Sequence, residues 1–520
     1  MVDALEYHEE TNHSPREIHN GDFSLDPRTK PRPYKVYEDL PRVELPSIRP
    51  PQGPALDAIS ESRADPVTDA ADGPEEFGRE ALATLCYEAS GVIREITTSD
   101  GREMAFRAAS CTGKLYHVDL YAVCGDFPDL AAGVYHFDPS RMALDVLREG
   151  DFRGIVANAV GGGGDGSTGV ADAPVTFVAT STWWRNAWKY RERTYRHAFW
   201  DSGTVLANLL AAAHATDRRG EVVAAFADDP IAELVGVDPG KEAPIALAPV
   251  GSGDPVPDPH PVEPIDPATE PLSSDCEEYP LIGEAWGAST LADGDAVGKW
   301  RRRVRDAISG RRFGSQTEDD EDRERIALDP VDSETASARP LHATIRRRGS
   351  CREYSREGPS RRQVRTILDR ATRGVPADWN AGAGNGLAFT DLHVLTTGVS
   401  GIPDGSYRYR SDEDVLERAA EIDREEKARL ALDQSWAGDA HVNVYLLADV
   451  EGIVEEFGNR GYRLAQLEAG LTLGRLYLAT YAHRELGGLG LTFYDDLASE
   501  KLAQGERTPT CLFAFGKRGD

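Results

Sequence analysis

Apolar residues recur at helical spacing in two long segments of the chain, one in each half. In the second half they lie three, four and seven positions apart, at Leu464, Leu467, Leu471 and Leu478. In the first half a similar pattern is formed by Leu206, Leu209, Leu210 and Ala213. This spacing predicts one buried face of a long helix in each half. Both segments are rich in Ala and Gly, which allows another helix to approach closely.

A short run of apolar and β-branched residues lies before each predicted helix. The runs span residues 175–179 and 442–448, and they have the composition of buried strands. We therefore predict an α+β fold for each half, with a central sheet flanked by helices.

The two halves also resemble each other in sequence. When Tyr195-Arg196 is placed over Tyr462-Arg463, at an offset of 267, further identities follow without a gap: Gly203 with Gly470, Leu206 with Leu473, Ala212 with Ala479, Gly220 with Gly487, Phe226 with Phe493 and Asp228-Asp229 with Asp495-Asp496. Earlier in each half the offset is 272, which pairs Asp119-Leu120 with Asp391-Leu392 and Gly133 with Gly405. Agreement in this order predicts a duplicated domain, with the two copies docked as a pseudo-dimer within one chain.

Composition divides the chain into four parts. Residues 1–74 are polar and Pro-rich, which predicts an extended arm. The two copies occupy residues 75–250 and 339–520. Residues 251–338 between them predict an acidic, Pro-rich linker, because segment 251–280 holds eight prolines, eight acidic residues and no Lys or Arg.

Charge and cysteine usage argue against several classes of function. The chain holds 58 Lys and Arg against 88 Asp and Glu, a net charge of −30, which opposes nucleic-acid binding. Only nine of the basic residues are Lys, and acidic excess with scarce Lys predicts a halophilic host. No apolar run approaches the ~20 residues that cross a bilayer, and the first residues lack a secretory signal, so we expect a cytoplasmic protein without a membrane anchor. Six cysteines without a C-x-x-C pair predict neither a metal site nor disulfides.

A cluster of arginines opens the second copy, in the sequence Arg346-Arg347-Arg348-Gly349-Ser350-Cys351-Arg352. Arginines beside a small residue and a hydroxyl can surround a phosphate with charge-assisted hydrogen bonds. A solvated basic face is the alternative. The first copy lacks the cluster, since only Arg63 is basic between residues 58 and 78. This one-sidedness favours a binding site.

The first copy has an unmatched aromatic cluster of its own. Three tryptophans lie between Trp183 and Trp188, and Lys189 and Tyr190 follow directly. A Lys surrounded by aromatic rings loses hydration and becomes a base near neutral pH, so Lys189 and Tyr190 form a candidate proton-transfer pair. The alternative is a partly buried aromatic seam with solvated charges at its rim. A loop of small residues that includes Ser110 and Gly113 suits close backbone approach to a ring.

These clusters together match a known family. The segment Arg348-Gly-Ser350-Cys-Arg352-Glu-Tyr354 resembles the R-x-S-x-R-x-F/Y motif of the nitroreductase superfamily, whose members bind FMN in a dimer interface. The first copy resembles the SagB-type branch, flavin oxidases that convert peptide azolines to azoles. The similar stretches are residues 107–116, 133–138 and 188–196, and residues 7–13 resemble the N-terminal arm of that branch.

The resemblance implies one composite FMN site between the two copies. The second copy would supply the phosphate-binding arginines and a Gly-rich loop, through Arg348, Ser350, Arg352, Gly488, Gly490, Lys517 and Arg518. The first copy would supply Ser110 and Gly113 beside the flavin ring, and Lys189 and Tyr190 as catalytic residues over it. The reciprocal site lacks the arginines in residues 58–78 and reads Gly382-Ala-Gly-Asn385 in place of Ser-x-x-Gly, so we expect one FMN per chain.

Three functions follow from this interpretation. The first is an FMN-dependent dehydrogenase of the SagB type, which oxidises azoline rings in a modified peptide and works with a cyclodehydratase partner. The second is a general NAD(P)H-dependent nitro or quinone reductase with a small-molecule substrate. The third is a degenerate flavin-binding scaffold within a modification complex.

Overall fold

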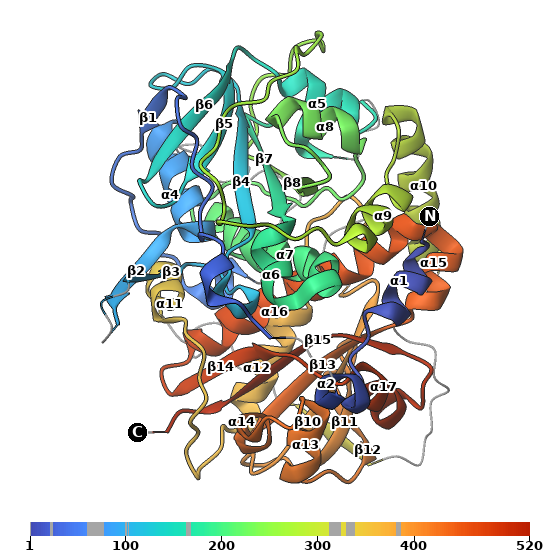
Figure 1. Ribbon diagram of the computed structural model, residues 1–520. Coiled ribbons are helices and arrows are strands. Elements are labelled where there is room, and N and C mark those ends of the chain that lie inside the picture. Colours follow the sequence, from blue (N-terminus) through green and yellow to red (C-terminus); the bar gives the residue numbers. More distant parts are fainter. Residues whose placement is uncertain are drawn as a thin grey trace.

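The structure is a computed structural model, and it describes residues 2–20, 24–59, 77–98, 101, 103–162, 168–310, 324–328, 339–380 and 386–519. Two α+β domains lie one above the other in Figure 1, the first in blue to green and the second in orange to red. This confirms the predicted fold class of two similar domains joined as a pseudo-dimer within one chain.

The first domain is built on an antiparallel sheet with helices around it. The strand order is β1 (Arg42–Glu44), β6 (Ala143–Glu149), β5 (Gly133–Asp138), β4 (Val118–Cys124), β7 (Val175–Thr182) and β8 (Glu242–Val250). Its helices are α4 (Arg79–Ser90), α5 (Arg153–Ala159), α6 (Trp183–Tyr190), α7 (Thr194–His214) and α8 (Asp228–Val235). A separate hairpin of β2 (Val92–Thr97) and β3 (Glu103–Arg107) projects at the left of Figure 1.

The second domain repeats this plan. Its sheet has the order β14 (Leu486–Leu491), β15 (Thr508–Lys517), β13 (Val442–Ala448), β10 (Thr390–Thr396), β11 (Gly405–Arg410), β12 (Val415–Ala420) and β9 (Arg325–Ala327). Its helices are α11 (Leu341–Arg347), α12 (Arg361–Thr372), α13 (Arg424–Leu430), α14 (Ser435–Asp439), α15 (Val450–Phe457), α16 (Asn459–Ala482) and α17 (Asp495–Ala503).

The structure confirms the elements on which the duplication was argued. The two β-branched runs form β7 and β13, and the two periodic apolar segments form α7 and α16. The paired stretches at the offset of 272 form equivalent strands, β4 with β10 and β5 with β11. The duplication therefore extends to the order and pairing of the strands.

Helices α7 and α16 pack along each other at the centre of the molecule (Figure 1). Their close approach requires Gly203 and Gly470, which occupy matching positions in the two copies. A Cβ atom on Gly203 would lie 2.3 Å from the backbone of Gly470, so a larger residue would force the helices apart. Near the other end of the contact, the rings of Tyr195 and Tyr462 lie parallel, with centroids 6.4 Å apart.

In each domain, a carboxylate forms ion pairs with two arginines of the other domain. Asp495 is bound by Arg193 and Arg196 of the first domain, each at 2.8 Å. At the matching place, Asp228 is bound by Arg460 and Arg463 of the second domain, at 2.5 and 2.7 Å. All six side chains are buried. Charges removed from water in this way are stable only when paired, so these contacts fix how the two domains dock.

The polar N-terminal arm enters the core more than its composition predicts. Its first helix, α1 (Ala4–Glu10), inserts Tyr7 between Tyr195 and Tyr462, with ring centroids 5.2 and 6.1 Å away. Tyr7 is fully buried, and its hydroxyl donates to the carbonyl of Glu192. The rest of the arm contains α2 (Pro15–Asn20), a 3₁₀ turn η1 (Pro27–Thr29) and α3 (Ala55–Ala58).

The described part of the acidic linker packs against both domains. It contains α9 (Pro280–Ala288) and α10 (Gly294–Gly310). The Trp286 carbonyl accepts a hydrogen bond from Arg463, and the Trp300 indole donates to the carbonyl of Phe457. Composition alone indicated an extended spacer, but these tryptophans anchor it to the second domain. No helix among the described residues is both long and apolar enough to cross a membrane.

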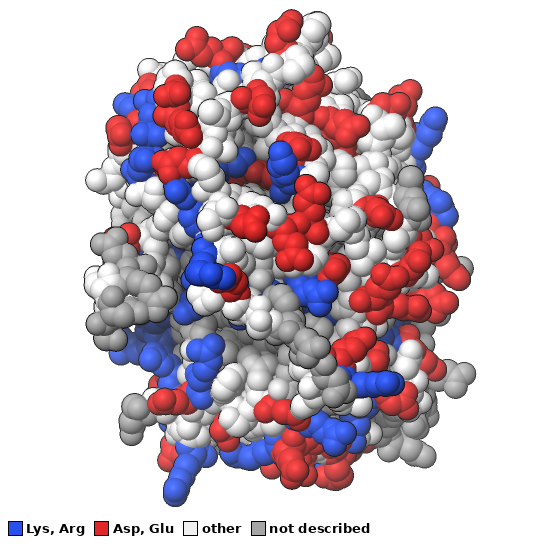
Figure 2. Space-filling view, viewed as in Figure 1, with Lys and Arg blue, Asp and Glu red and all other residues white. Residues whose placement is uncertain are grey.

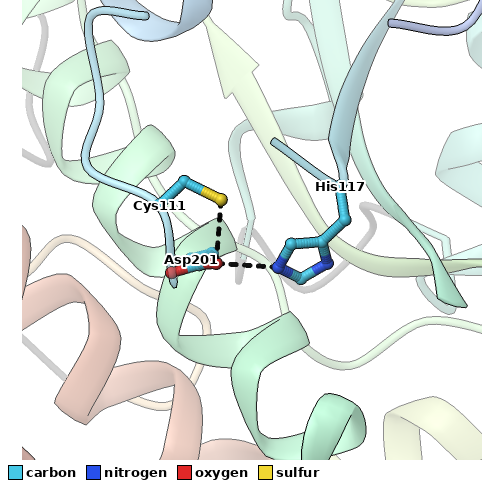
Figure 3. A group of neighbouring side chains, drawn as sticks. All are labelled: Cys111, His117 and Asp201. Carbon is cyan, nitrogen blue, oxygen red and sulfur yellow. Dashed lines mark hydrogen bonds and ion pairs between the residues drawn. The ribbon is translucent and has the colours of Figure 1, made fainter. Parts of the chain in front are cut away.

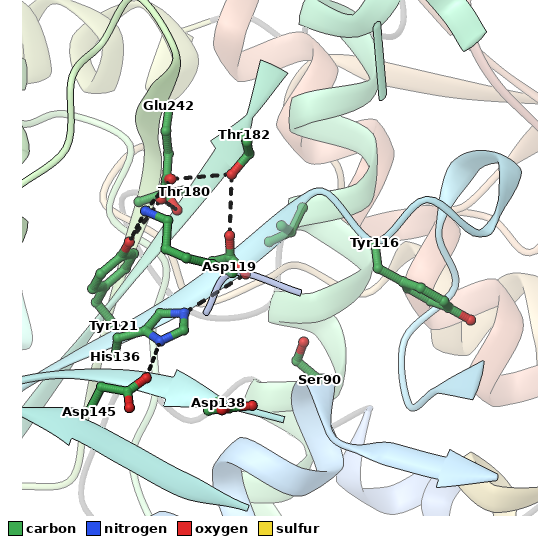
Figure 4. Close-up of polar contacts among 12 residues, drawn as sticks. Ser90, Tyr116, Asp119, Tyr121, His136, Asp138, Asp145, Thr180, Thr182 and Glu242 are labelled. Carbon is green, nitrogen blue, oxygen red and sulfur yellow. Dashed lines mark hydrogen bonds and ion pairs between the residues drawn. The ribbon is translucent and has the colours of Figure 1, made fainter. Parts of the chain in front are cut away.

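A buried polar network holds the arm against the first sheet (Figure 4). Lys35 of the arm forms an ion pair with Glu242 at 2.5 Å, and Glu242 also accepts from Tyr121 and Thr180. Beside it, His136 lies between Asp119 and Asp145. Because cations and carboxylates alternate through this network, we interpret it as structural.

Candidate active site between the two domains

The predicted binding residues of the second domain lie together along one edge of its sheet. The segment after α11 follows β14, where the Cys351 amide donates to the carbonyl of Gly488 at 3.3 Å. Farther along, Tyr354 pairs with Arg518 and the Ser355 amide donates to the carbonyl of Lys517. The segment that carries Ser350 and Arg352 therefore runs beside the glycines of β14 and the end of β15. Ser350 and Arg352 are exposed there.

Arg348 connects this edge to the first domain. Its guanidinium donates to the carbonyl oxygens of Arg107, Ala108 and Ala109, at 2.7, 2.8 and 3.1 Å. The next residue in the first domain is Ser110, which lies beside Tyr477 of the second domain. The Tyr477 hydroxyl in turn accepts from the Gly490 amide at 2.6 Å. The structure thus brings Arg348, Ser110 and Gly490 together across the domain boundary.

Gly113 and Tyr190 are also in direct contact. Gly113 has φ +64°, and a Cβ atom there would lie 2.9 Å from the Tyr190 hydroxyl. Helix α6 ends at Tyr190 because Arg191, with φ +51°, turns the chain away. Burial raises the pKa of Tyr190 well above its usual value, so its phenol stays protonated at neutral pH. The Lys189 ammonium lies 5.0 Å from the centroid of this ring.

Asp201 of α7 holds the loop that carries Ser110 and Gly113 (Figure 3). Its carboxylate accepts from the Thr112 amide at 2.9 Å, from the Cys111 thiol at 3.2 Å and from His117 at 2.7 Å. The candidate ligand atoms of Cys111, His117 and Asp201 lie within 4.8 Å of one another, close enough to share a metal ion. Burial raises the pKa of the thiol well above its usual value, so Cys111 is a hydrogen-bond donor and not a nucleophile.

Basic residues lower the pKa of Lys189. Burial lowers it first, and the positive charges of Lys114 and Arg352 lower it further, with Lys30 acting in the same direction. A lowered pKa raises the neutral fraction of the amine at physiological pH, which is what a general base requires.

The pseudo-equivalent place in the second domain lacks this pair. Helix α15 matches α6 at both ends, so Glu456 takes the place of Lys189 and Phe457 the place of Tyr190. Neither a phenol nor an amine is available there. The other features expected to be lost, in residues 58–78 and 382–385, lie mostly outside the described residues.

Comparison with known proteins identifies the second domain. Residues 345–517 match the family model described as Nitroreductase family. The C-terminal domain belongs to the nitroreductase family. None of the curated proteins matches the chain.

The whole chain has the fold of a protein from Anabaena variabilis that is assigned as a nitroreductase. The two structures align over 99% of each chain with a TM-score of 0.74 and 21% sequence identity. A nitroreductase-assigned structure from Ralstonia eutropha aligns with 43% of this chain and 99% of its own, at 17% identity and a TM-score of 0.32. The Escherichia coli microcin synthetase McbBCD complex with truncated pro-MccB17 aligns with 49% of this chain and 88% of its own, at 18% identity and a TM-score of 0.31.

The residues at the domain boundary fit a flavin mononucleotide. Arg348 and Arg352 form no ion pair with any described residue. The Nε and Nη2 groups of Arg348 bind carbonyl oxygens, which leaves its Nη1 group for a phosphate, whereas Arg352 is exposed. A small recess lies behind the Ser110 loop, lined in part by Ala109, Tyr116 and Val205. It is bordered by Arg107, which is 3% exposed and whose Nε atom has no hydrogen-bond partner among the described residues. The cationic donors suit the phosphate of FMN, and the small residues Ser110 and Gly113 allow close approach to its ring.

Several residues of this region were not singled out from the sequence. Tyr477 contacts Gly490 at the domain boundary, and Asp201 holds the Ser110 loop; each is a polar residue on a long buried helix. A polar residue on the buried face of a predicted helix was the sequence signal that could have pointed to them. Lys114 follows Gly113 directly, and only the fold shows that it lies near Lys189.

Proposed function

We propose that this chain is an FMN-dependent oxidoreductase with a single flavin site between its two domains. The observation that carries the proposal is the contact of Arg348 with the loop before Ser110, which joins the arginine cluster of one copy to the Lys189–Tyr190 side of the other. The copies differ at each of these places, so one composite site is complete and its reciprocal is not.

The second domain would hold the phosphate. Arg348, Arg352 and Arg518 present cationic groups along one edge, and Ser350 adds a hydroxyl donor. Lys517 lies on the same edge and forms ion pairs with Glu357 and Glu485. Gly488 and Gly490 let the backbone of β14 approach the ring, with Ser110 and Gly113 opposite. Bound FMN would accept a hydride from the substrate, which is chemistry that amino-acid side chains do not supply.

The first domain would handle the proton. Lys189, with its lowered pKa, takes a proton from the substrate as hydride leaves. Tyr190 keeps its phenolic proton and donates a hydrogen bond that orients the substrate or relays the proton. Burial of the Tyr190 ring between Gly113 and His197 fixes its hydroxyl in one place.

We further propose that the substrate is an azoline ring in a modified peptide, which the enzyme oxidises to an azole as SagB-type enzymes do. Such a ring loses one hydride and one proton, which matches a flavin acceptor with an adjacent base. A cyclodehydratase would have to form the ring first, so that enzyme is the expected partner.

The test is the absorbance spectrum of purified protein in high salt, with FMN quantified per chain. We expect one FMN per chain and anaerobic bleaching by a thiazoline-containing peptide, whose product has lost two hydrogens. Rapid bleaching by NAD(P)H without reaction of the peptide would instead identify a nitro or quinone reductase. Colourless protein that does not take up FMN would identify a scaffold.

A further inference from the structure

Basic side chains from separate segments of the first domain and the arm gather around Lys189. We call Lys30, Arg94, Lys114 and Lys189 the basic cluster. Arg94 and Lys114 both lie over the ring of Phe106, at 4.3 and 5.3 Å from its centroid.

Two further contacts tie the cluster together. Lys114 follows Gly113, which contacts Tyr190 next to Lys189. On the other side, the Trp188 indole donates to the carbonyl of Asp26 and to the Thr29 hydroxyl, at 3.1 and 3.2 Å. This fixes the end of η1, and therefore Lys30, against the helix that carries Lys189. Segments distant in sequence thus place Lys30 and Lys114 near Lys189, with Arg94 next to Lys114.

None of the four forms an ion pair with a residue in the described part of the chain. The chain as a whole carries a net charge of −30. Three of its nine lysines belong to the basic cluster. The mutual repulsion is reflected in the lowered pKa values of both Lys114 and Lys189. Four like charges without a counter-ion among the described residues create a surface that attracts anions.

The FMN phosphate would engage only part of this charge. Arg352 of the second domain acts on both Lys114 and Lys189, so the basic cluster adjoins the proposed phosphate site, but its own four side chains come from the first domain and the arm. Lys30, Arg94 and Lys114 are exposed, and neither of the two described cavities includes them. In Figure 2, Lys and Arg side chains run left of centre at the level where the domains meet. An open, extended surface suits a chain with several carboxylates better than one compact anion.

We propose that the basic cluster binds carboxylates of an acidic peptide substrate and so positions its reacting ring beside Lys189. The proposal rests on the proposed function and specifies its substrate class. Each ammonium or guanidinium would form a charge-assisted hydrogen bond to a carboxylate, and the like charges would raise the association rate of acidic chains.

The test uses the flavin-loaded full chain and a fluorescently labelled glutamate-rich peptide, with its glutamine counterpart as the neutral probe. We expect the acidic peptide to bind more tightly, and its affinity to fall as salt increases. The double variant Lys30→Gln/Lys114→Gln should bind it about tenfold more weakly, since each exposed charge contributes modestly. The double variant Lys241→Gln/Lys299→Gln removes two exposed lysines elsewhere and should bind like the wild type.

Equal binding of the two peptides by flavin-loaded protein would overturn the acidic-peptide proposal and leave the flavin site intact. Weaker binding of NADPH, but not of the peptide, in the Lys30→Gln/Lys114→Gln variant would also overturn it, because the cluster would then serve a nucleotide phosphate. Flavin content is measured on the same samples. Loss of flavin in wild-type protein would refute the proposed function itself.

Discussion

Gly113 and Tyr190 are packed so closely that a Cβ atom on Gly113 would lie 2.9 Å from the Tyr190 hydroxyl and 3.0 Å from its ring. Gly113 also adopts φ +64°, which residues with a side chain rarely accept. The glycine therefore has two functions, since it permits the turn and leaves room for the phenol. The position of the Tyr190 hydroxyl thus depends on having a glycine, which lacks a side chain, at position 113.

Substitution Gly113→Ala should displace Tyr190 and strain the loop. We expect turnover to fall while the free energy of unfolding drops by about 1–2 kcal/mol. Chemical denaturation and steady-state assays would measure the two effects. Gly287→Ala is the matched control, because Gly287 lies in α9 with open space around it and its replacement should not lower either quantity. Normal turnover in Gly113→Ala would contradict the proposed placement.

Removal of the phosphate arginines should weaken flavin binding. Arg348→Ala and Arg352→Ala should each cost about 1.5–3 kcal/mol, or roughly ten- to a hundredfold in FMN affinity, because a charged partner of the phosphate is lost. Fluorescence titration with FMN measures this. Arg356→Ala, at an exposed arginine nearby, is the control. Undiminished affinity in both variants, or two FMN per chain, would refute the single composite site.

The proton-transfer pair should affect turnover and not flavin content. We expect Lys189→Ala and Tyr190→Phe to lower turnover by about 10²–10⁴-fold, the usual range for general acid–base groups. A thiazoline peptide and a quinone with NADH should both be assayed, and the flavin content determined from the spectrum. If both variants turn over like the wild type with flavin retained, the residues belong to an aromatic seam.

The pH dependence should report the charges around Lys189. Burial and the charge of Lys114 lower the pKa of Lys189, and a base must be neutral to act, so activity should rise as pH increases through that pKa. Lys114→Gln removes a positive neighbour, which favours the protonated form and raises the pKa. The rising limb of the pH profile should therefore move to higher pH. Lys241→Gln should leave it in place, and an unshifted limb in Lys114→Gln would exclude this coupling.

Docking of the domains should depend on the exchanged carboxylates. Asp495→Asn leaves Arg193 and Arg196 buried without a counter-charge, and should lower the free energy of unfolding by about 3–5 kcal/mol. The exposed neighbour Asp496 provides the control Asp496→Asn. If Asp495→Asn lowers the free energy of unfolding no more than Asp496→Asn does, the carboxylate–arginine contact does not hold the interface.

The same pair predicts an acid dependence. The two arginines hold the pKa of Asp495 below its usual range in the folded state, so its stabilisation is complete above the unfolded pKa near 4. That stabilisation is lost as pH falls through the folded value. Wild-type stability should therefore decline more steeply in acid than that of Asp495→Asn, as measured by denaturation at a series of pH values.

The sequence determined the architecture, because residue spacing and internal similarity can be recognised without knowing which residues meet in space. Leucine spacing predicted α7 and α16, and β-branched runs predicted β7 and β13. Matched residues at the offset of 267 predicted the pseudo-dimer, since Asp228 and Asp495 now occupy equivalent contacts. Motifs in each copy also named Arg348 and Lys189 as members of one site, by resemblance to a family.

Only the tertiary structure decided which groups meet. The burial of Tyr7 depends on two tyrosines from different domains, which no local pattern reports. The contact between Gly113 and Tyr190, the anchoring of the loop by Asp201 and the approach of Lys30 to Lys189 all join segments separated by many residues. The physical reason is that pKa values and charge balance depend on neighbours in space. A sequence shows which side chains are available, and the fold sets the distances through which their charges act.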